Sequence, residues 1–206
     1  MTLSLLVNEY YEFIKKIKDE LNQLDAAQGD GDLGNTMVGG AKALKVEAEN
    51  TKNIPDWLVE GGKAFRKAAP STMGILIASA MIKAGKQQKE NNRLEWSDIQ
   101  KTMIEEIMKR GKASRGDKTL LDAFIPAVNA FEEASDQGVS IALKEAASTA
   151  KAEAEKTKNL NAKTGRSSWM GDRAKGNMDG GAWLCYKTYQ FLADWVKYEE
   201  KKGEKS

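Results

Sequence analysis

Apolar residues recur every three or four positions along most of the chain, which is the spacing of an amphipathic α-helix. Residues 2–24 show this most clearly, with apolar side chains at Leu3, Leu6, Tyr10, Phe13, Ile14, Ile17 and Leu21. The alternation of β-branched and polar residues that is typical of strands is nearly absent. Alanine, leucine, lysine and glutamate, which favour helices, dominate the sequence. The pattern therefore predicts an all-α protein.

Eight helices are predicted from the periodic segments and from the residues that can cap them. They span residues 2–24, 35–50, 56–69, 75–84, 97–111, 118–135, 139–159 and 181–200, with Asp56 and Ser97 as caps. Because the connections are short, we expect an antiparallel up-and-down bundle or helical barrel. No linker divides the sequence, so the prediction is one domain over residues 1–206, with a frayed tail at about residues 197–206.

Composition excludes several kinds of function. The 206 residues are 41% hydrophobic and 30% charged, as in a folded globular protein, and the net charge of +2 gives no bulk attraction to nucleic acid or membrane. No apolar run reaches the roughly 18 residues of a spanning helix. The single cysteine, Cys185, and the lack of a signal-peptide pattern indicate a cytoplasmic location. Since there is no histidine, a Ser-His-Asp triad, a His-ligated metal and a phosphohistidine on this chain are excluded.

The most informative stretch is an acidic loop at residues 25–37, where Asp25, Asp30 and Asp32 lie among three glycines. Two carboxylates ~4 Å apart repel by about 4 kcal/mol at an effective dielectric of about 20, so such crowding favours a bound cation. Carboxylate oxygens suit Mg²⁺ or Ca²⁺, and the register of an EF-hand is missing. The glycines and the start of the next helix favour a polyphosphate beside the metal. The alternative is a solvated turn with an ordinary helix cap.

Three further connections carry unusual residues. Residues 70–74 are small and precede a helix, residues 110–119 are basic and contain glycine, and residues 161–181 form a long loop rich in glycine and charge. In an up-and-down bundle these connections and the acidic loop lie at the same end, which predicts a single site. Arg166, in the long loop, can bind phosphate through two N–H groups. Taken alone, residues 70–74 are also compatible with a plain cap, and residues 110–119 with a solvated turn.

Taken in order, the segments GDGDLGNTM, RGKASRGDKTLLDAFIPA and AKTGRSSWMGDRAKGNMDGGA resemble the nucleotide-binding L subunit of dihydroxyacetone kinase, a family of glycerol metabolism. The resemblance covers nearly the whole chain. It implies an eight-helix antiparallel barrel that holds ADP or ATP with two Mg²⁺ ions at one end. It places the metal ligands at Asp25, Asp30 and Asp32. It places nucleotide contacts at Leu33, Gly34, Asn35, Thr36, Thr72, Met73, Gly111, Leu120, Arg166, Asp179, Gly180 and Gly181.

The resemblance also implies an activity, a phosphotransferase reaction in which Arg166 neutralises charge on the transferred group. Phosphate would pass from Mg-bound ATP, or from ADP rephosphorylated by the M subunit of a phosphotransferase system, to dihydroxyacetone held on a partner K subunit. The alternatives are a regulatory nucleotide-sensing subunit without turnover, which in some systems binds a transcription regulator, and a kinase subunit for another small ketose or polyol.

The chain departs from the family pattern in three places. Leu33 stands where histidine is usual, and Ser71-Thr72-Met73-Gly74 stands where the family usually has Gly-Ala-Ser-Gly. The usual Asp-Pro-Gly is replaced by Asp179-Gly180-Gly181. The three acidic residues are all present, so the hypothesis of nucleotide binding through a metal is retained.

Overall fold

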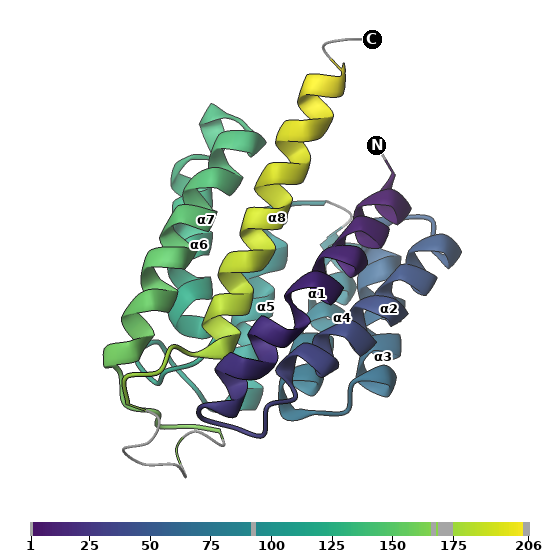
Figure 1. The fold of residues 1–206 in the computed structure, drawn as a ribbon. Coiled ribbons are helices and arrows are strands. Elements are labelled where there is room, and N and C mark those ends of the chain that lie inside the picture. Colours follow the sequence, from purple (N-terminus) through teal and green to yellow (C-terminus); the bar gives the residue numbers. More distant parts are fainter. Residues whose placement is uncertain (1, 92–93, 166–167, 169–174, 204–206) are drawn as a thin grey trace. The chain divides into compact units, whose positions relative to one another are not determined.

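Figure 1 shows the chain as a computed structural model in which residues 2–91, 94–165, 168 and 175–203 are described. Over these residues the chain forms eight α-helices and no strand, so the all-α prediction is confirmed. The elements are α1 (Leu3–Ala26), α2 (Leu33–Asn50), α3 (Ile54–Ala68), α4 (Thr72–Asn91), α5 (Trp96–Gly111), α6 (Leu121–Glu133), the 3-10 turn η1 (Ser135–Gln137), α7 (Val139–Lys156), the 3-10 turn η2 (Thr157–Asn159) and α8 (Gly180–Gly203). None of the described helices combines the length and the apolar character needed to cross a bilayer.

The chain divides into two compact units, Thr2–Ala113 with helices α1 to α5 and Ser114–Ser206 with helices α6 to α8. In the first unit each helix packs against the next, from α1 on α2 to α4 on α5 (Figure 1). In the second unit α7 packs against both α6 and α8, and α6 also contacts α8. Short connections make successive helices antiparallel, as the up-and-down prediction requires within each unit. The single-domain assignment stays a prediction.

Small residues allow helices to approach closely in both units. In the first unit the Phe65 ring occupies the space beside Gly40, where a Cβ would lie 2.1 Å from Cζ of Phe65. In the second unit Ala142, Ala146 and Ala150 of α7 are fully buried between α6 and α8. Interiors packed this tightly gain dispersion contacts that a larger side chain would disrupt.

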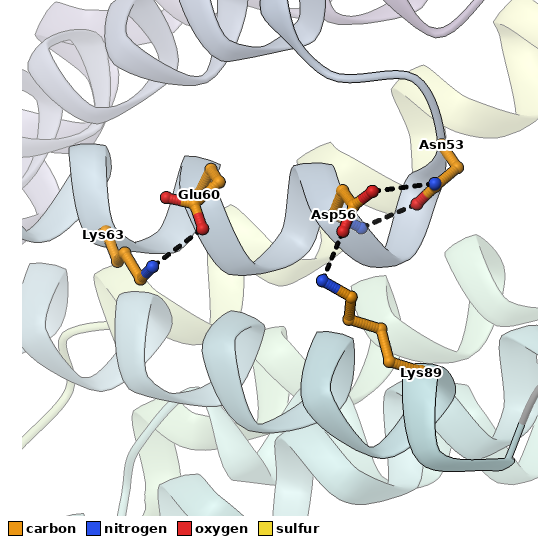
Figure 2. A network of polar contacts seen from close by, with 5 residues as sticks. All are labelled: Asn53, Asp56, Glu60, Lys63 and Lys89. Atoms are coloured by element: carbon orange, nitrogen blue, oxygen red, sulfur yellow. Dashed lines mark hydrogen bonds and ion pairs between the residues drawn. The ribbon is translucent and has the colours of Figure 1, made fainter.

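Helix α3 begins one turn earlier than the sequence predicted. Asn53, not Asp56, is its cap: Oδ1 of Asn53 accepts a hydrogen bond from the Asp56 N–H at 2.9 Å (Figure 2). The Asp56 side chain instead accepts a bond from Asn53 and forms an ion pair with Lys89 of α4, and these contacts lower the pKa of its carboxyl, the Lys89 contact most. Glu60 and Lys63, one turn further along, form a second exposed ion pair at 2.7 Å (Figure 2).

Other helix boundaries also differ from prediction, most clearly in α4, α5 and α6. Helix α4 starts at Thr72 and runs to Asn91, beyond the predicted 75–84, and its second half continues to bury residues, among them Gly85 and Gln88. Helix α5 follows Glu95, so Ser97 lies inside it and is not its cap. Helix α6 starts at Leu121 because the backbone of Lys118 is left-handed, with φ of 62°. Helix α8 is described through Gly203, and fraying of its end stays a prediction.

Candidate functional site

The three acidic residues of the predicted metal loop come together in the first unit. Asp25 lies in the last turn of α1, Asp30 lies in the connection, and Asp32 immediately precedes α2. One carboxylate oxygen from each lies within 4.8 Å of the other two. At this separation like charges repel by about 3 kcal/mol per pair at an effective dielectric of about 20. Three convergent carboxylates at a partly exposed loop are donors that fit a hard divalent cation such as Mg²⁺.

The Asp25 side chain has a second task, because it organises the loop itself. Its Oδ2 accepts hydrogen bonds from the N–H groups of Asp32 at 2.9 Å and Leu33 at 3.3 Å. Gly29 leaves room for this carboxylate, since a Cβ at position 29 would lie 2.6 Å from Oδ1 of Asp25. Asp32, in the cap position of α2, makes no capping bond with its own side chain. Asp25 therefore caps α2, and the carboxylate of Asp32 forms part of the triad without a capping bond.

Asn22, one turn before Asp25 on α1, also caps α2. Its Oδ1 accepts hydrogen bonds from the N–H groups of Gly34 at 2.7 Å and Asn35 at 3.3 Å. Gly34 can pack here only without a side chain, because a Cβ would lie 2.0 Å from the backbone oxygen of Lys18. The first turn of α2 is thus locked onto α1.

This arrangement changes how the predicted phosphate turn is understood. The N–H groups of residues 32–35 donate hydrogen bonds to side chains of α1. The N–H of Thr36 donates to the backbone oxygen of Asp32 at 2.9 Å. The Leu33 side chain is buried and Asn35 is exposed. The amide groups at the start of α2, where the sequence predicted polyphosphate contacts, therefore have partners within the chain, and of residues 33–36 only Asn35 is exposed.

The second predicted loop of the first unit lies against the first. Oγ1 of Thr36 donates a hydrogen bond to Oγ of Ser71 at 3.1 Å, and the same Ser71 oxygen accepts the N–H of Gly74 at 3.1 Å. Ser71 thus caps α4 and joins it to the start of α2. Thr72 is exposed and Met73 is half-buried at this helix start. The predicted approach of these two loops is confirmed within this unit.

The second unit brings together the two other predicted loops. Lys118, which is only 1% exposed, donates hydrogen bonds from Nζ to the backbone oxygens of Leu160 at 3.3 Å and Asn177 at 2.7 Å. Lys163 N–H bonds to the Asp117 backbone oxygen at 3.2 Å. The connection before α6 and the connection before α8 therefore share one end of this unit.

Asp122 and Asp179 shape the two helix starts there. Asp122 is buried and accepts hydrogen bonds from the N–H groups of Gly116 at 2.5 Å and Thr119 at 2.7 Å. Asp179 caps α8 through the Ala182 N–H at 2.7 Å. Gly180 and Gly181, both buried, form the first residues of that helix.

The charges of this cluster perturb one another. Burial raises the pKa of the Asp179 carboxyl to about 7, and the neighbouring carboxylate of Asp122 adds to the rise, while the Ala182 N–H and the Lys118 ammonium oppose it. Burial lowers the pKa of the Lys118 ammonium, and attraction to Asp179 partly restores it. The raised pKa of the half-buried Asp179 carboxyl and the lowered pKa of the buried Lys118 ammonium indicate a region of low effective dielectric.

The remaining predicted residues are distributed over both units. Gly111 is half-buried at the end of α5, with space for a Cβ 3.6 Å from Leu76, and Leu120 is half-buried just before α6. Arg166 lies outside the described residues. That all four loops contribute to a single site stays a prediction.

Sequence reasoning missed several residues that hold these loops. Asn22 had a usable signal, since it lies three residues before Asp25 and so on the same face of α1. Lys118 had none, because a lysine in a basic, glycine-containing turn has the pattern of a solvated residue. Thr157 likewise gave no signal, although it is fully buried and its Oγ1 accepts the Asp179 N–H at 2.9 Å.

The fold is all-α, and three carboxylates that could hold a metal ion converge at the connection between two of its helices. Comparison with known proteins identifies the family. The model of the DAK2 domain family matches residues 27–194. The chain is 30% identical over 184 residues to the ADP-binding subunit DhaL of the PEP-dependent dihydroxyacetone kinase 1 of Listeria innocua, covering 86% of this chain and 87% of the relative. The chain belongs to the DAK2 domain family.

Longer relatives contain a similar region. The L-erythrulose 1-kinase of Mycolicibacterium smegmatis is 32% identical over 170 residues, which are 79% of this chain and 30% of that protein. The crystal structure of the dihydroxyacetone kinase of C. freundii superposes with a TM-score of 0.75 at 24% identity, covering 93% of this chain and 34% of that one. Its complex with AMP-PNP and Mg²⁺ gives a TM-score of 0.74 at 23% identity. At this level of identity the structural likeness establishes the fold.

Proposed function

We propose that this chain is the nucleotide-binding, phosphoryl-transfer subunit of a dihydroxyacetone kinase. The observation that carries the proposal is the convergence of Asp25, Asp30 and Asp32 within 4.8 Å. The proposal is supported by membership of the DAK2 family and by the likeness to an ADP-binding DhaL subunit along most of both chains. The cofactors are then Mg²⁺, as two ions, and ADP or ATP.

The residues of the first unit supply the metal and phosphate side of this reaction. Asp25, Asp30 and Asp32 would hold Mg²⁺, which when bound offsets phosphate charge and aligns the transferred group. Asp25 reaches this position because the same carboxylate caps α2, so metal ligation and loop geometry are coupled. Asn35, Thr72 and Met73, which are exposed or half-buried at the two neighbouring helix starts, are the proposed nucleotide contacts there. Leu33, Gly34 and Thr36 are buried, so contact with the nucleotide through them requires a change in this helix start.

Nucleotide contacts are also proposed for residues of the second unit. Asp179, Gly180 and Gly181 start α8, where the helix N-terminus favours a negatively charged ligand. Arg166 is the proposed catalytic residue, because a guanidinium matches the charge of a transferring phosphoryl group. Leu120 of this unit and Gly111 of the first unit are the proposed contacts on the adenine side. Because positioning and electrostatics dominate this chemistry, the absence of histidine is no obstacle.

The proposed cycle needs partners. Dihydroxyacetone would be held on a K subunit, and ADP that stays bound would be rephosphorylated by the M subunit of a phosphotransferase system; where ATP exchanges freely, the M subunit is dispensable. A transcription regulator is a further proposed partner. Neither nucleic acid nor a membrane is needed by this mechanism.

The test is Mg²⁺-dependent ADP binding, measured by calorimetry. We expect wild type to bind Mg·ADP and the double variant Asp30→Ala, Asp32→Ala to lose at least tenfold in affinity. The matched control is Asp19→Ala with Asp136→Ala, which removes the same charge from exposed positions outside the loop. Equal affinity of the two double variants would refute the metal bridge.

A second candidate is a kinase subunit for another small ketose, which the likeness to an L-erythrulose 1-kinase favours. Mixing the chain with a K subunit and either ATP or a phosphorylated phosphotransferase component, and offering dihydroxyacetone or erythrulose, separates the two by the sugar phosphate formed. Mg·ADP binding without any sugar phosphate would instead support a nucleotide-sensing regulatory subunit.

A further inference from the structure

Lys118 is the most unusual charged residue of the second unit. Its side chain is 1% exposed, and its backbone adopts the left-handed conformation with φ of 62°, which residues other than glycine rarely adopt. Both features are unfavourable when taken alone. A buried ammonium loses its hydration, and a left-handed backbone persists only where surrounding contacts fix it.

The ammonium compensates for its burial by holding two separate parts of the chain. Its Nζ donates hydrogen bonds to the backbone oxygens of Leu160 and Asn177, which lie 42 and 59 residues away in sequence. Two backbone bonds lie close by: Lys163 N–H to the Asp117 oxygen at 3.2 Å and Gly176 N–H to the Lys158 oxygen at 3.0 Å. Lys118 therefore joins the segment that follows α7 to the segment that precedes α8.

The bond from Lys118 to Asn177 lies close in sequence to the start of α8 at Gly180. Asn177 is two residues before Asp179, whose N–H is bonded to Oγ1 of the fully buried Thr157 and whose carboxylate caps Ala182. Attraction between the Lys118 ammonium and the Asp179 carboxylate adds to these bonds. The backbone at Asp179, Gly180 and Gly181 is thus fixed from both sides, by Asn177 and by Thr157.

We propose that Lys118 is a positioning residue for the nucleotide, whose ammonium clasps Leu160 and Asn177 together and so presents Asp179, Gly180 and Gly181 in the geometry that binds Mg·ADP. An apolar side chain would fill this space without the cost of desolvating a charge, so the lysine is explained by the specific geometry that its bonds impose. The inference rests on the proposed function, and the role it assigns to Lys118 acts through Asp179, Gly180 and Gly181.

The chain contains a closely matched control. Lys112 also has a left-handed backbone, with φ of 49°, but its side chain is exposed. Lys118→Met and Lys112→Met therefore remove the same charge from similar backbone geometry while keeping an unbranched stem. Only Lys118→Met removes a buried ammonium that bonds two segments of the chain.

Three readouts test the proposal. We expect Lys118→Met to lose at least tenfold in Mg·ADP affinity and Lys112→Met to stay within twofold of wild type. Hydrogen exchange should accelerate at the Gly176 and Asp179 amides in Lys118→Met alone. Binding of Mn²⁺ without nucleotide, followed by electron paramagnetic resonance, should be unchanged in both variants, because the acidic triad belongs to the other unit.

Each outcome is decisive. Mg·ADP binding by wild type with equal affinity in both variants overturns the inference and leaves the proposed function standing. Failure of wild type to bind Mg·ADP overturns the proposed function and this role together. If Lys118→Met does not fold, hydrogen exchange in the wild-type protein without nucleotide decides the question. The proposal requires slow exchange at the Gly176 and Asp179 amides. Exchange there at the rate of exposed amides would refute the role of Lys118 in holding these segments.

Discussion

The hydroxyl of Thr36 donates a hydrogen bond to the hydroxyl of Ser71 at 3.1 Å, and this contact joins the starts of α2 and α4. Ser71 simultaneously accepts the N–H of Gly74, so one oxygen serves as a helix cap and as a link between two helices. The relationship places the acidic loop beside the second predicted loop. It also makes the stability of one helix start depend on the other.

Removing both hydroxyls should reveal this dependence. We expect Ser71→Ala to lower the free energy of unfolding by about 1–2 kcal/mol, since a cap is lost and the Thr36 hydroxyl is left without this acceptor. In a double-mutant cycle with Thr36→Val, measured by urea denaturation, the coupling should be about 0.5–1.5 kcal/mol. Asn53→Ala, which removes an exposed cap on α3, is the control and should add to Thr36→Val without coupling. Additivity in both cycles would contradict the link.

Asn22 should matter for the metal loop although it is no ligand in the proposed site. Asn22→Ala removes the acceptor for the Gly34 and Asn35 amides and should destabilise the protein by about 1–2 kcal/mol. The loosened helix start should also weaken Mg·ADP binding, because Asp32 lies at that start. Gln23→Ala, at the exposed neighbouring position, should change neither quantity. Thermal unfolding and calorimetry on the same samples provide the measurement.

The acidic triad should cost stability when no metal is present. Asp32→Asn removes one of three clustered charges and no capping bond, so we expect the metal-free protein to gain up to about 1 kcal/mol after solvent screening. The same variant should lose most of the rise in melting temperature that Mg·ADP gives wild type. Asp19→Asn, at an exposed position, is the control. A variant that is less stable than wild type without metal would show that repulsion within the triad is negligible.

Asp179 should make the stability depend on pH in an unusual direction. Its pKa is raised from 3.8 to about 7, so between these values the folded protein holds a proton that the unfolded chain has released. Stability from this group is therefore present in full below about pH 4, falls as pH rises to about 7, and then levels off. Asp179→Asn should flatten this slope in urea denaturation measured from pH 4 to 8.

The exposed Asp136→Asn variant provides the comparison for that experiment. It should keep the slope of wild type, because its carboxylate lies in water. A slope shared by wild type and both variants would assign the pH dependence to other groups.

The helical pattern of the sequence was sufficient to predict the fold class and most helices. The apolar spacing of a helix does not depend on which neighbours it packs against, because every helix must bury one apolar stripe. The predicted and observed helices agree for this reason. The helix starts were predicted less well. Asn53 and not Asp56 caps α3, and Ser97 does not cap α5. Several polar residues near a helix start are able to cap it, and only the backbone conformation of the folded chain determines which one does.

The three aspartates were also recognisable in the sequence, because crowded carboxylates are unfavourable without a cation. Their meeting within 4.8 Å, however, depends on the turn between α1 and α2, which Asp25 itself stabilises through two amides. Only the folded chain shows that these amides, assigned by sequence to phosphate, are already bonded.

The sequence by itself determined that this protein is helical and that its unusual chemistry lies in the connections, since periodicity and residue type are local properties. Tertiary structure alone decided which polar side chains support those connections. Lys118 has the sequence pattern of a solvated residue and is instead buried against two carbonyls from distant positions, as Asn22 is bonded to the start of the next helix. Such partners are brought together by packing, and no local pattern encodes a contact whose two halves lie 59 residues apart.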